Sequence, residues 1–143
     1  MSRFPEGTIV RHVRVDRTRT PQAVIDATGR KQYVEKEVLE TIPKGEGNEV
    51  DVYFVPKNSL PLLKKEISAF LAQYGLVPDP RAQAAVNEQD PSFADEYPNG
   101  TQWGDKNFLK FGGWGDRPGV SCGCDDDGWI APWFLSGVLA SCA

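Results

Sequence analysis

Alternating apolar and polar residues mark the clearest strand of the chain, residues 49–55 (EVDVYFV). In an extended chain, one side carries Val50, Val52 and Phe54, and the other side carries Asp51 and Tyr53. A half-buried strand has this two-residue period. Residues 8–15 alternate less regularly and predict a second strand of the same kind.

A helical period predicts the longest helix, residues 59–74, which Gly75 ends. Its apolar stripe consists of Leu63, Ile67, Phe70, Leu71 and Tyr74. Two shorter helices are predicted to begin at Thr20-Pro21 and at Asp79-Pro80. In each pair, the first side chain can accept a hydrogen bond from a free helix N–H, and proline is tolerated in the first turn. Residues 31–42 fit both a strand and a helix, and the sequence leaves this choice open.

Between the last predicted helix and the C-terminal quarter, residues 92–104 are predicted to form a loop with three buried anchors, Phe93, Tyr97 and Trp103. Within it, Asn99-Gly100 is a dipeptide typical of turns. Residues 107–111 then predict a strand. The apolar residues 132–140 predict a buried strand at the centre of a sheet.

The C-terminal quarter, residues 108–143, combines three of the four tryptophans and all three cysteines with many glycines. Residues 119–125 alternate in side-chain size. The pattern predicts that Val120, Cys122 and Cys124 face a core, because a buried thiol behaves as a small apolar group. The residues between them, Gly119, Ser121, Gly123 and Asp125, are then expected to be exposed.

Length and composition fit a single domain of 143 residues, 1–143, with 40% hydrophobic and 25% charged residues. The net charge of −4 argues against nucleic acid as the main partner, because such binding depends on Lys and Arg. The early basic residues are expected to form a solvated basic surface; they are Arg3, Arg11, Arg14, Arg17, Arg19, Arg30 and Lys31. No apolar run is long enough for a membrane span and no signal peptide is evident, so a cytoplasmic location is expected unless a partner exports the chain.

No catalytic or metal-binding arrangement emerges from the sequence, and neither a cofactor nor a metal is expected. The only histidine, His12, is predicted to lie on a strand surface. Cys122-Gly123-Cys124 has one intervening residue and so matches neither a redox C-x-x-C motif nor a usual zinc site. The acidic run 125–127 fails the spacing of a calcium loop. Three cysteines also exclude a complete disulfide framework.

The amino-acid alphabet changes at residue 108. Residues 1–107 contain nine Glu, six Gln and one Met, whereas residues 108–143 contain none of the three, and Lys110 is the only lysine there. A segment of strands and loops lowers Glu and Gln to some extent, since both favour helices.

This alphabet, with tryptophans between small residues, resembles the variable region of diversity-generating retroelement target proteins. In that family, adenine-randomised Asn-type codons cannot yield Glu, Gln, Met, Lys or Trp. The ending Trp133-Phe134-Leu135-Ser136-Gly137-Val138 is similar to the family's closing strand. Upstream, the strand at 49–55, the helix after it and NEQDPSFADEYPNGTQW resemble the family's scaffold, so the likeness covers Glu49 to Val138. Leu139 departs from the Arg that the family commonly has, and residues 1–48 match no part of it.

The resemblance implies an α+β, C-type-lectin-like fold: two helices packed on antiparallel strands, with a loop-rich C-terminal binding face. Residues 1–107 would be the scaffold and 108–143 the variable region, with Trp114, Trp129, Trp133 and Phe134 as fixed framework. The variable patch is expected to consist of Gly112, Gly115, Asp116, Gly119, Ser121, Gly123, Asp125, Asp127, Ile130, Ala131 and Pro132.

The function implied is binding of a variable protein or another macromolecular ligand, not catalysis, and the oligomeric state stays open. Two alternatives remain at this point. One is a small structural or regulatory protein, related to phage, with a fixed C-terminus. The other, less favoured, is a small enzyme that uses Cys122, Cys124 or the acidic run 125–127.

Overall fold

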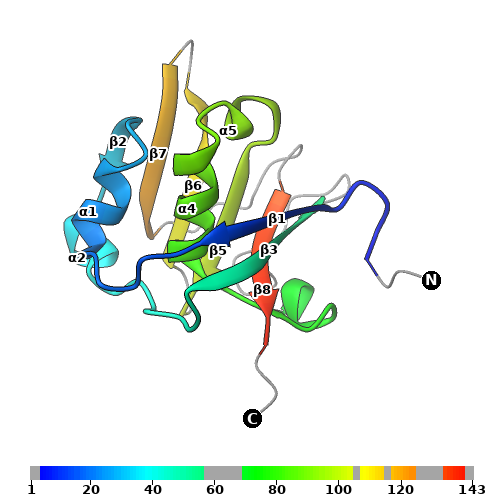
Figure 1. Cartoon of the computed structure of the whole chain (residues 1–143). Helices are drawn as coiled ribbons and strands as arrows, with labels where there is room; N and C mark the ends of the chain where they lie inside the picture. Colours follow the sequence, from blue (N-terminus) through cyan, green and yellow to red (C-terminus); the bar gives the residue numbers. More distant parts are fainter. Residues whose placement is uncertain (1–3, 57–68, 105–106, 115–116, 125–133, 141–143) are drawn as a thin grey trace.

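One mixed sheet of eight strands organises the protein (Figure 1). The computed structural model describes residues 4–56, 69–104, 107–114, 117–124 and 134–140. Seven strands follow the order β1-β3-β8-β5-β6-β7-β2, and β4 pairs with β8 beside this path. The strands are β1 (Ile9–Arg14), β2 (Lys31–Val34), β3 (Glu49–Pro56), β4 (Leu76–Val77), β5 (Asn99–Trp103), β6 (Asn107–Trp114), β7 (Arg117–Cys124) and β8 (Phe134–Leu139). The α+β class expected from the sequence is therefore confirmed.

The resemblance implied antiparallel strands, but two of the strand pairs are parallel. β2 runs parallel to β7, and β5 runs parallel to β8. The other pairs, including β1 with β3 and β6 with β7, are antiparallel. The β5–β8 pair joins two halves of the sheet, because β8 also pairs with β3.

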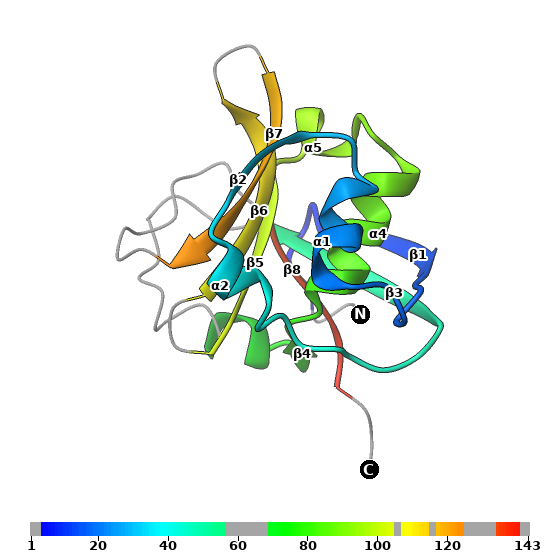
Figure 2. The ribbon, with the colours of Figure 1, turned by 90° about the vertical axis from the view of Figure 1, so that its left-hand side faces the viewer.

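The helices whose full bounds the structure describes are α1 (Pro21–Asp26), α2 (Lys36–Leu39), α4 (Pro80–Gln89) and α5 (Phe93–Glu96). α1 and α4 lie on the same side of the sheet (Figure 2). Their predicted starts are confirmed: Thr20 Oγ1 accepts from Ala23 N at 3.1 Å, and Asp79 Oδ1 accepts from Ala82 N at 3.1 Å. The ambiguous stretch 31–42 contains both kinds of structure, β2 followed by α2. Of the helix predicted for 59–74, residues 69–72 are helical and residues 57–68 lie outside the described part.

Two apolar clusters fill the helix side of the sheet. The first packs α1, α2 and α4 against β5, β6 and β7, with Ile25, Phe111 and Val120 fully buried. The second packs α4 against β1 and β3, with Phe54 and Phe93 at its centre and their rings 4.8 Å apart. The inward faces predicted for residues 8–15 and 49–55 are confirmed by the burial of Val13, Val52 and Phe54.

Residues 99–103 correct the sequence prediction most strongly. The predicted loop with a turn at Asn99-Gly100 is instead β5, a strand of five buried residues between β8 and β6. The strand tolerates the buried side chains of Asn99 and Thr101 because both form hydrogen bonds inside the protein. Thr101 Oγ1, for example, donates to the carbonyl of Ser136 at 2.8 Å. Two of the anchors predicted in this stretch, Phe93 and Trp103, are buried, and Tyr97 is half-buried.

β8 is a central strand, as predicted for residues 132–140, of which 132–133 lie outside the described part. Its residues 135–137 are buried, but Leu139 is 47% exposed. Gly137 shows why a glycine is needed in it. A Cβ atom at Gly137 would lie 2.9 Å from the carbonyl oxygen of Val77 and 3.0 Å from Cβ of Leu76. The close approach of β4 to β8 therefore depends on the missing side chain.

Candidate functional site

The candidate site is the face of β2, β7 and β6 opposite to the one that α1 and α4 cover. Partners in adjacent strands share a face, so the registers arrange its residues in rows. One row contains Lys31, Gly119 and Gly112, and the next contains Tyr33, Ser121 and Lys110. We call these six residues the glycine face. In the second row, Ser121 thus lies between the longer side chains of Tyr33 and Lys110.

Four of the predicted patch residues belong to the described strands, and their burial corrects the sequence prediction. Gly112, Gly119 and Gly123 are buried and Ser121 is half-buried, so the expected exposure of the three glycines is wrong. Strand alternation identified the side of the sheet on which these residues lie, but it does not reveal what covers that side. Tyr33, which sequence reasoning did not select, is 45% exposed in the same row as Ser121.

The remaining predicted patch residues lie outside the described residues: Gly115, Asp116, Asp125, Asp127, Ile130, Ala131 and Pro132. The same holds for the predicted framework residues Trp129 and Trp133 and for the side chain of Trp114. Phe134 is half-buried and packs against the second apolar cluster. Its ring lies 5.5 Å from that of Tyr97 in an edge-on arrangement.

Arg30 binds β6 and β7, two of the three strands that carry the glycine face. Its Nε donates to the carbonyl of Gly119 at 3.0 Å and its Nη2 donates to the carbonyl of Gly112 at 3.0 Å. Nη1 donates to the carbonyl of Pro91, and Nη2 also reaches Asp95 Oδ1 at 3.1 Å. The side chain is 3% exposed. A planar guanidinium can bind several acceptors at once, so one residue links α5, β6 and β7.

Arg17 is the second buried arginine. It donates to the carbonyls of Lys44, Glu46 and Gly47 and to both carboxylate oxygens of Asp79. The prediction that the early basic residues form a solvated surface is therefore wrong for Arg17 and Arg30. As whole residues, they are 9% and 8% exposed. The composition revealed their charge, but the distant carbonyls that they bind could not be located from the sequence.

The cysteines of β7 differ in environment. Cys122 is 1% exposed, as predicted, whereas Cys124 is half-buried and its thiol donates to Glu35 Oε2 at 3.7 Å. Burial and then the charge of Glu35 raise the pKa of the Cys122 thiol to about 12. A thiol with so high a pKa is almost fully protonated at neutral pH, so it is a poor nucleophile and a poor metal ligand.

His12 lies on the surface of β1, as predicted, but two carboxylates from β3 contact it. Its Nδ1 lies 2.8 Å from Asp51 Oδ1 and its Nε2 lies 3.2 Å from Glu49 Oε1. Hydrogen bonds to Asp51, and then to Glu49, raise the pKa of the imidazole. Among the described residues, no three His, Cys, Asp or Glu side chains are grouped so that they could hold a metal ion.

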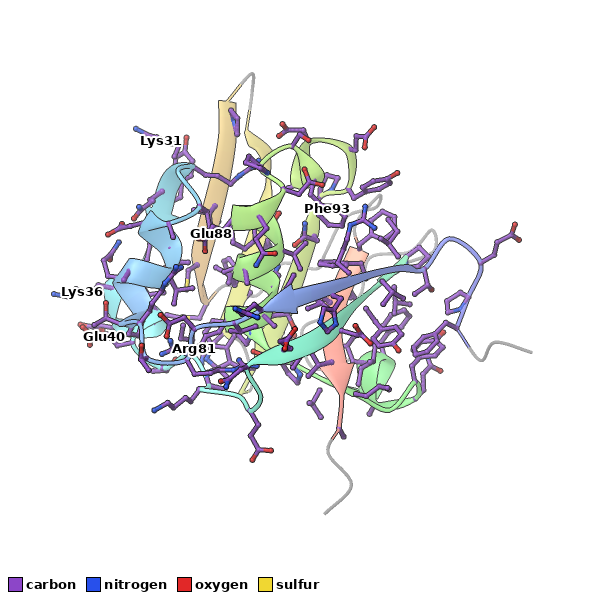
Figure 3. All side chains as sticks on the ribbon, in the orientation of Figure 1. Lys31, Lys36, Glu40, Arg81, Glu88 and Phe93 are labelled. Atoms are coloured by element: carbon purple, nitrogen blue, oxygen red, sulfur yellow. The ribbon has the colours of Figure 1, made fainter. Side chains whose placement is uncertain are left out.

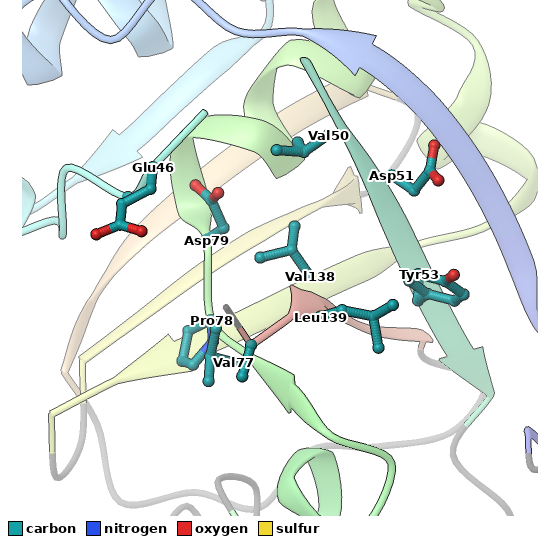
Figure 4. A pocket seen from close by; sticks show the side chains of 11 residues that line it. Glu46, Val50, Asp51, Tyr53, Val77, Pro78, Asp79, Val138 and Leu139 are labelled. Carbon is teal, nitrogen blue, oxygen red and sulfur yellow. The ribbon is translucent and has the colours of Figure 1, made fainter. Parts of the chain in front are cut away.

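A groove of about 410 Å³ opens on a different part of the molecule, between β3, β8 and the chain leading to α4 (Figure 4). Tyr53, Val77 and Leu139 give it apolar walls, while Asp51 and Glu46 supply carboxylates. None of the four predicted patch residues that the structure describes lines it. The groove and the glycine face are therefore separate features.

Comparison with protein-family models, curated proteins and solved structures finds no match for this chain. In the part of the chain that the structure describes, no helix is long and apolar enough to cross a membrane.

Proposed function

We propose that this chain is a ligand-binding protein of the diversity-generating retroelement class, with a C-type-lectin-like fold and a binding surface whose side chains change between variants. The ligand is a protein or another macromolecule. The proposal rests on the resemblance of residues 49–138 and on the way in which β6 and β7 are held.

The main observation in support of the proposal is that β6 and β7 are bound through their main-chain atoms. Arg30 binds Gly112 and Gly119 through their carbonyl oxygens, which every amino acid possesses. β2 binds β7 in the same way, and the N–H of Glu35 donates to the carbonyl of Cys122 at 2.8 Å. A scaffold that binds main-chain atoms keeps its strands in position when side chains are replaced, as a variable region requires.

The glycine face also offers suitable contact groups around the small residues. Tyr33 is 45% exposed, and tyrosine supplies a large contact area at a low cost in conformational entropy. Lys110 Nζ lies 4.4 Å from the centre of the Phe108 ring, which fixes an amino group beside Ser121. These groups lie beside the predicted variable positions and would contribute to binding in every variant.

Not every predicted position can accept a large side chain equally well. A Cβ atom at Gly123 would lie 3.2 Å from Cδ of Glu35 and 3.4 Å from Cζ of Phe108. Replacement there requires Glu35 to move. Ser121, which is half-buried, already carries a Cβ atom and a polar group. Ser121 is therefore the described position best suited to vary.

The decisive experiment is to sequence the gene in many cells of one population. The proposal predicts variation confined to the codons for residues 112–132, with the codons for Trp114 and Trp129 unchanged. A uniform C-terminus would instead favour a structural or regulatory protein.

A biochemical experiment tests the same proposal on the purified protein. Replacing Ser121 by Asn, Tyr or Asp is expected to change the free energy of unfolding by less than about 1 kcal/mol. The matched control is Val120→Asn at the adjacent, fully buried position, where an unpaired buried amide costs about 1–3 kcal/mol beyond the lost apolar packing. Equal losses at the two positions would contradict the assignment of Ser121 to a variable surface.

A further inference from the structure

A second hollow, of about 210 Å³, lies between α4 and the segment that joins β1 to α1. Its wall includes three arginines, Arg14, Arg19 and Arg81, and two acids, Asp16 and Glu88. Arg81 and Glu88 come from α4, where a separation of seven residues brings them to the same side of the helix (Figure 3). Val24 and Ala85 add apolar atoms to the wall.

The acids do not neutralise the arginines of this hollow. Glu88 is engaged by Arg19, whose Nη1 lies 2.7 Å from Glu88 Oε1. Asp16 also pairs with Arg19, at 3.8 Å, and its Oδ1 accepts from the N–H and hydroxyl of Thr18. Three guanidinium groups against two carboxylates leave one positive charge, and both carboxylates are already committed to Arg19.

Arg81 has no carboxylate in contact with it, although Asp79 and Asp16 act on its charge from a greater distance. It is 8% exposed, and within the described residues no carboxylate lies within 4.0 Å of its guanidinium. Its Nη1 donates to the carbonyl of Arg19 at 2.7 Å, and its Nε is buried without a partner. Burial, and then the neighbouring charge of Arg17, lower the pKa of Arg81. Both carboxylate oxygens of Asp79 accept hydrogen bonds from Arg17, so Asp79 stabilises the charge of Arg81 only from a distance.

We propose that this hollow is an anion site that binds a single phosphate-sized oxyanion between Arg14, Arg19 and Arg81. Guanidinium groups bind phosphate oxygens through paired, charge-assisted hydrogen bonds. Pockets for whole organic ligands usually measure about 300–1,000 Å³. A hollow of about 210 Å³ therefore suits one phosphate group, free or at the end of a larger molecule, better than an entire nucleotide.

This site is distinct from the glycine face and does not depend on the proposed function. It is formed by β1, the segment after it and α4, all within residues 1–107, which precede the predicted variable region. Every variant of the protein would therefore retain it.

The test is to titrate the full-length protein with inorganic phosphate at constant ionic strength, by calorimetry and by amide chemical shifts. We expect saturable binding in the millimolar range or tighter, with shifts at Val15, Ala85 and Glu88 and none on β7. Acetate at equal concentrations is the control for a carboxylate ligand and is expected to bind more weakly. No saturation with phosphate, equal binding of acetate, or shifts centred on β7 would overturn the proposal.

Two variants are expected to change the affinity for phosphate in opposite directions. Arg14→Gln removes an exposed guanidinium from the hollow and is expected to weaken phosphate binding about three- to ten-fold. Asp16→Asn removes a repelling carboxylate, retains the acceptor for Thr18, and is expected to tighten binding. General destabilisation would not produce a gain in affinity.

The matched control is Arg11→Gln, which makes the same change on the same strand. Arg11 lies over the ring of Phe93 at 5.1 Å and does not line the hollow. Its replacement is expected to leave phosphate affinity within experimental error. If Arg11→Gln weakened binding as much as Arg14→Gln, the effect would come from the overall charge of the protein, and the site would be refuted.

Discussion

Arg17 and Asp79 form a buried ion pair with two hydrogen bonds, from Nη1 to Oδ1 at 2.7 Å and from Nη2 to Oδ2 at 2.8 Å. Their side chains are 8% and 2% exposed. Asp79 also caps α4, and Arg17 also holds the carbonyls of the segment 44–47. This pair therefore links the start of α4 to the chain that leads into β3.

Removing one partner of this pair should be costly. Asp79→Asn leaves Arg17 buried without a counter-ion, and we expect the free energy of unfolding to fall by about 3–5 kcal/mol in denaturant titrations. The control is Glu88→Gln, since the side chains of Glu88 and its partner Arg19 are 31% and 37% exposed and neither is left buried without a counter-ion. A loss of about 1 kcal/mol or less is expected there. Similar losses for the two variants would refute the structural role of Asp79.

Gly45 provides an independent test of the same region. Its φ is +70°, and an added Cβ atom would lie 2.5 Å from Nη1 of Arg17 and 3.0 Å from Oδ1 of Asp79. Gly29 has a φ of +67° but no atom within 4 Å of an added Cβ. Both Gly→Ala changes incur about 1–2 kcal/mol for the left-handed conformation. Gly45→Ala should cost about 1–3 kcal/mol more than Gly29→Ala in thermal unfolding, because it also disturbs the ion pair.

The pH dependence of His12 has a definite sign. Hydrogen bonds to Asp51 and then Glu49 raise its pKa above 6.5, so the protonated ring favours the folded state. The stabilisation is complete below about pH 6.5 and is lost as the pH rises through the pKa of the folded protein. Because His12 is the only histidine, one ring signal in an NMR titration reports its pKa. Asp51→Asn should lower that midpoint, and an unchanged midpoint would contradict the contact.

Thiol labelling tests the alternative of a cysteine-dependent enzyme. A variant that retains only Cys122 should resist labelling at neutral pH until it is unfolded, because its pKa is about 12 and it is 1% exposed. A variant that retains only Cys124 should react sooner, since that thiol is half-buried. Fast labelling of native Cys122 would revive the catalytic interpretation.

Particular residues show how far the sequence predicts the fold. The strand at 49–55 and the helix after Asp79 were predictable because local alternation and a capping side chain are determined within a few residues. β5 was missed because Asn99, Thr101 and Gln102 are polar, whereas they are buried in the structure. Asn99 accepts from Gln83 Nε2 at 2.9 Å, and a partner sixteen positions away has no local signal.

The sequence also predicted the candidate site only in part. Alternation correctly directed Val120 and Cys122 toward the core and assigned Gly119 and Ser121 to the other side of β7. It could not reveal the burial of the glycines or the hold of Arg30 on their carbonyls, because both depend on segments distant in sequence. Tyr33 was missed for a similar reason: its strand joins the sheet only through a parallel pairing with β7.

The position of β8 has a consequence for the timing of folding. Among the described strands, backbone hydrogen bonds connect β3 to β5 only through β8, which follows β5, β6 and β7 in the sequence. On the ribosome, β5, β6 and β7 emerge before the strand that completes the sheet, and such distant pairings form slowly. A substitution in residues 108–133 therefore acts first on an unfinished chain, before β8 has joined β3 to β5.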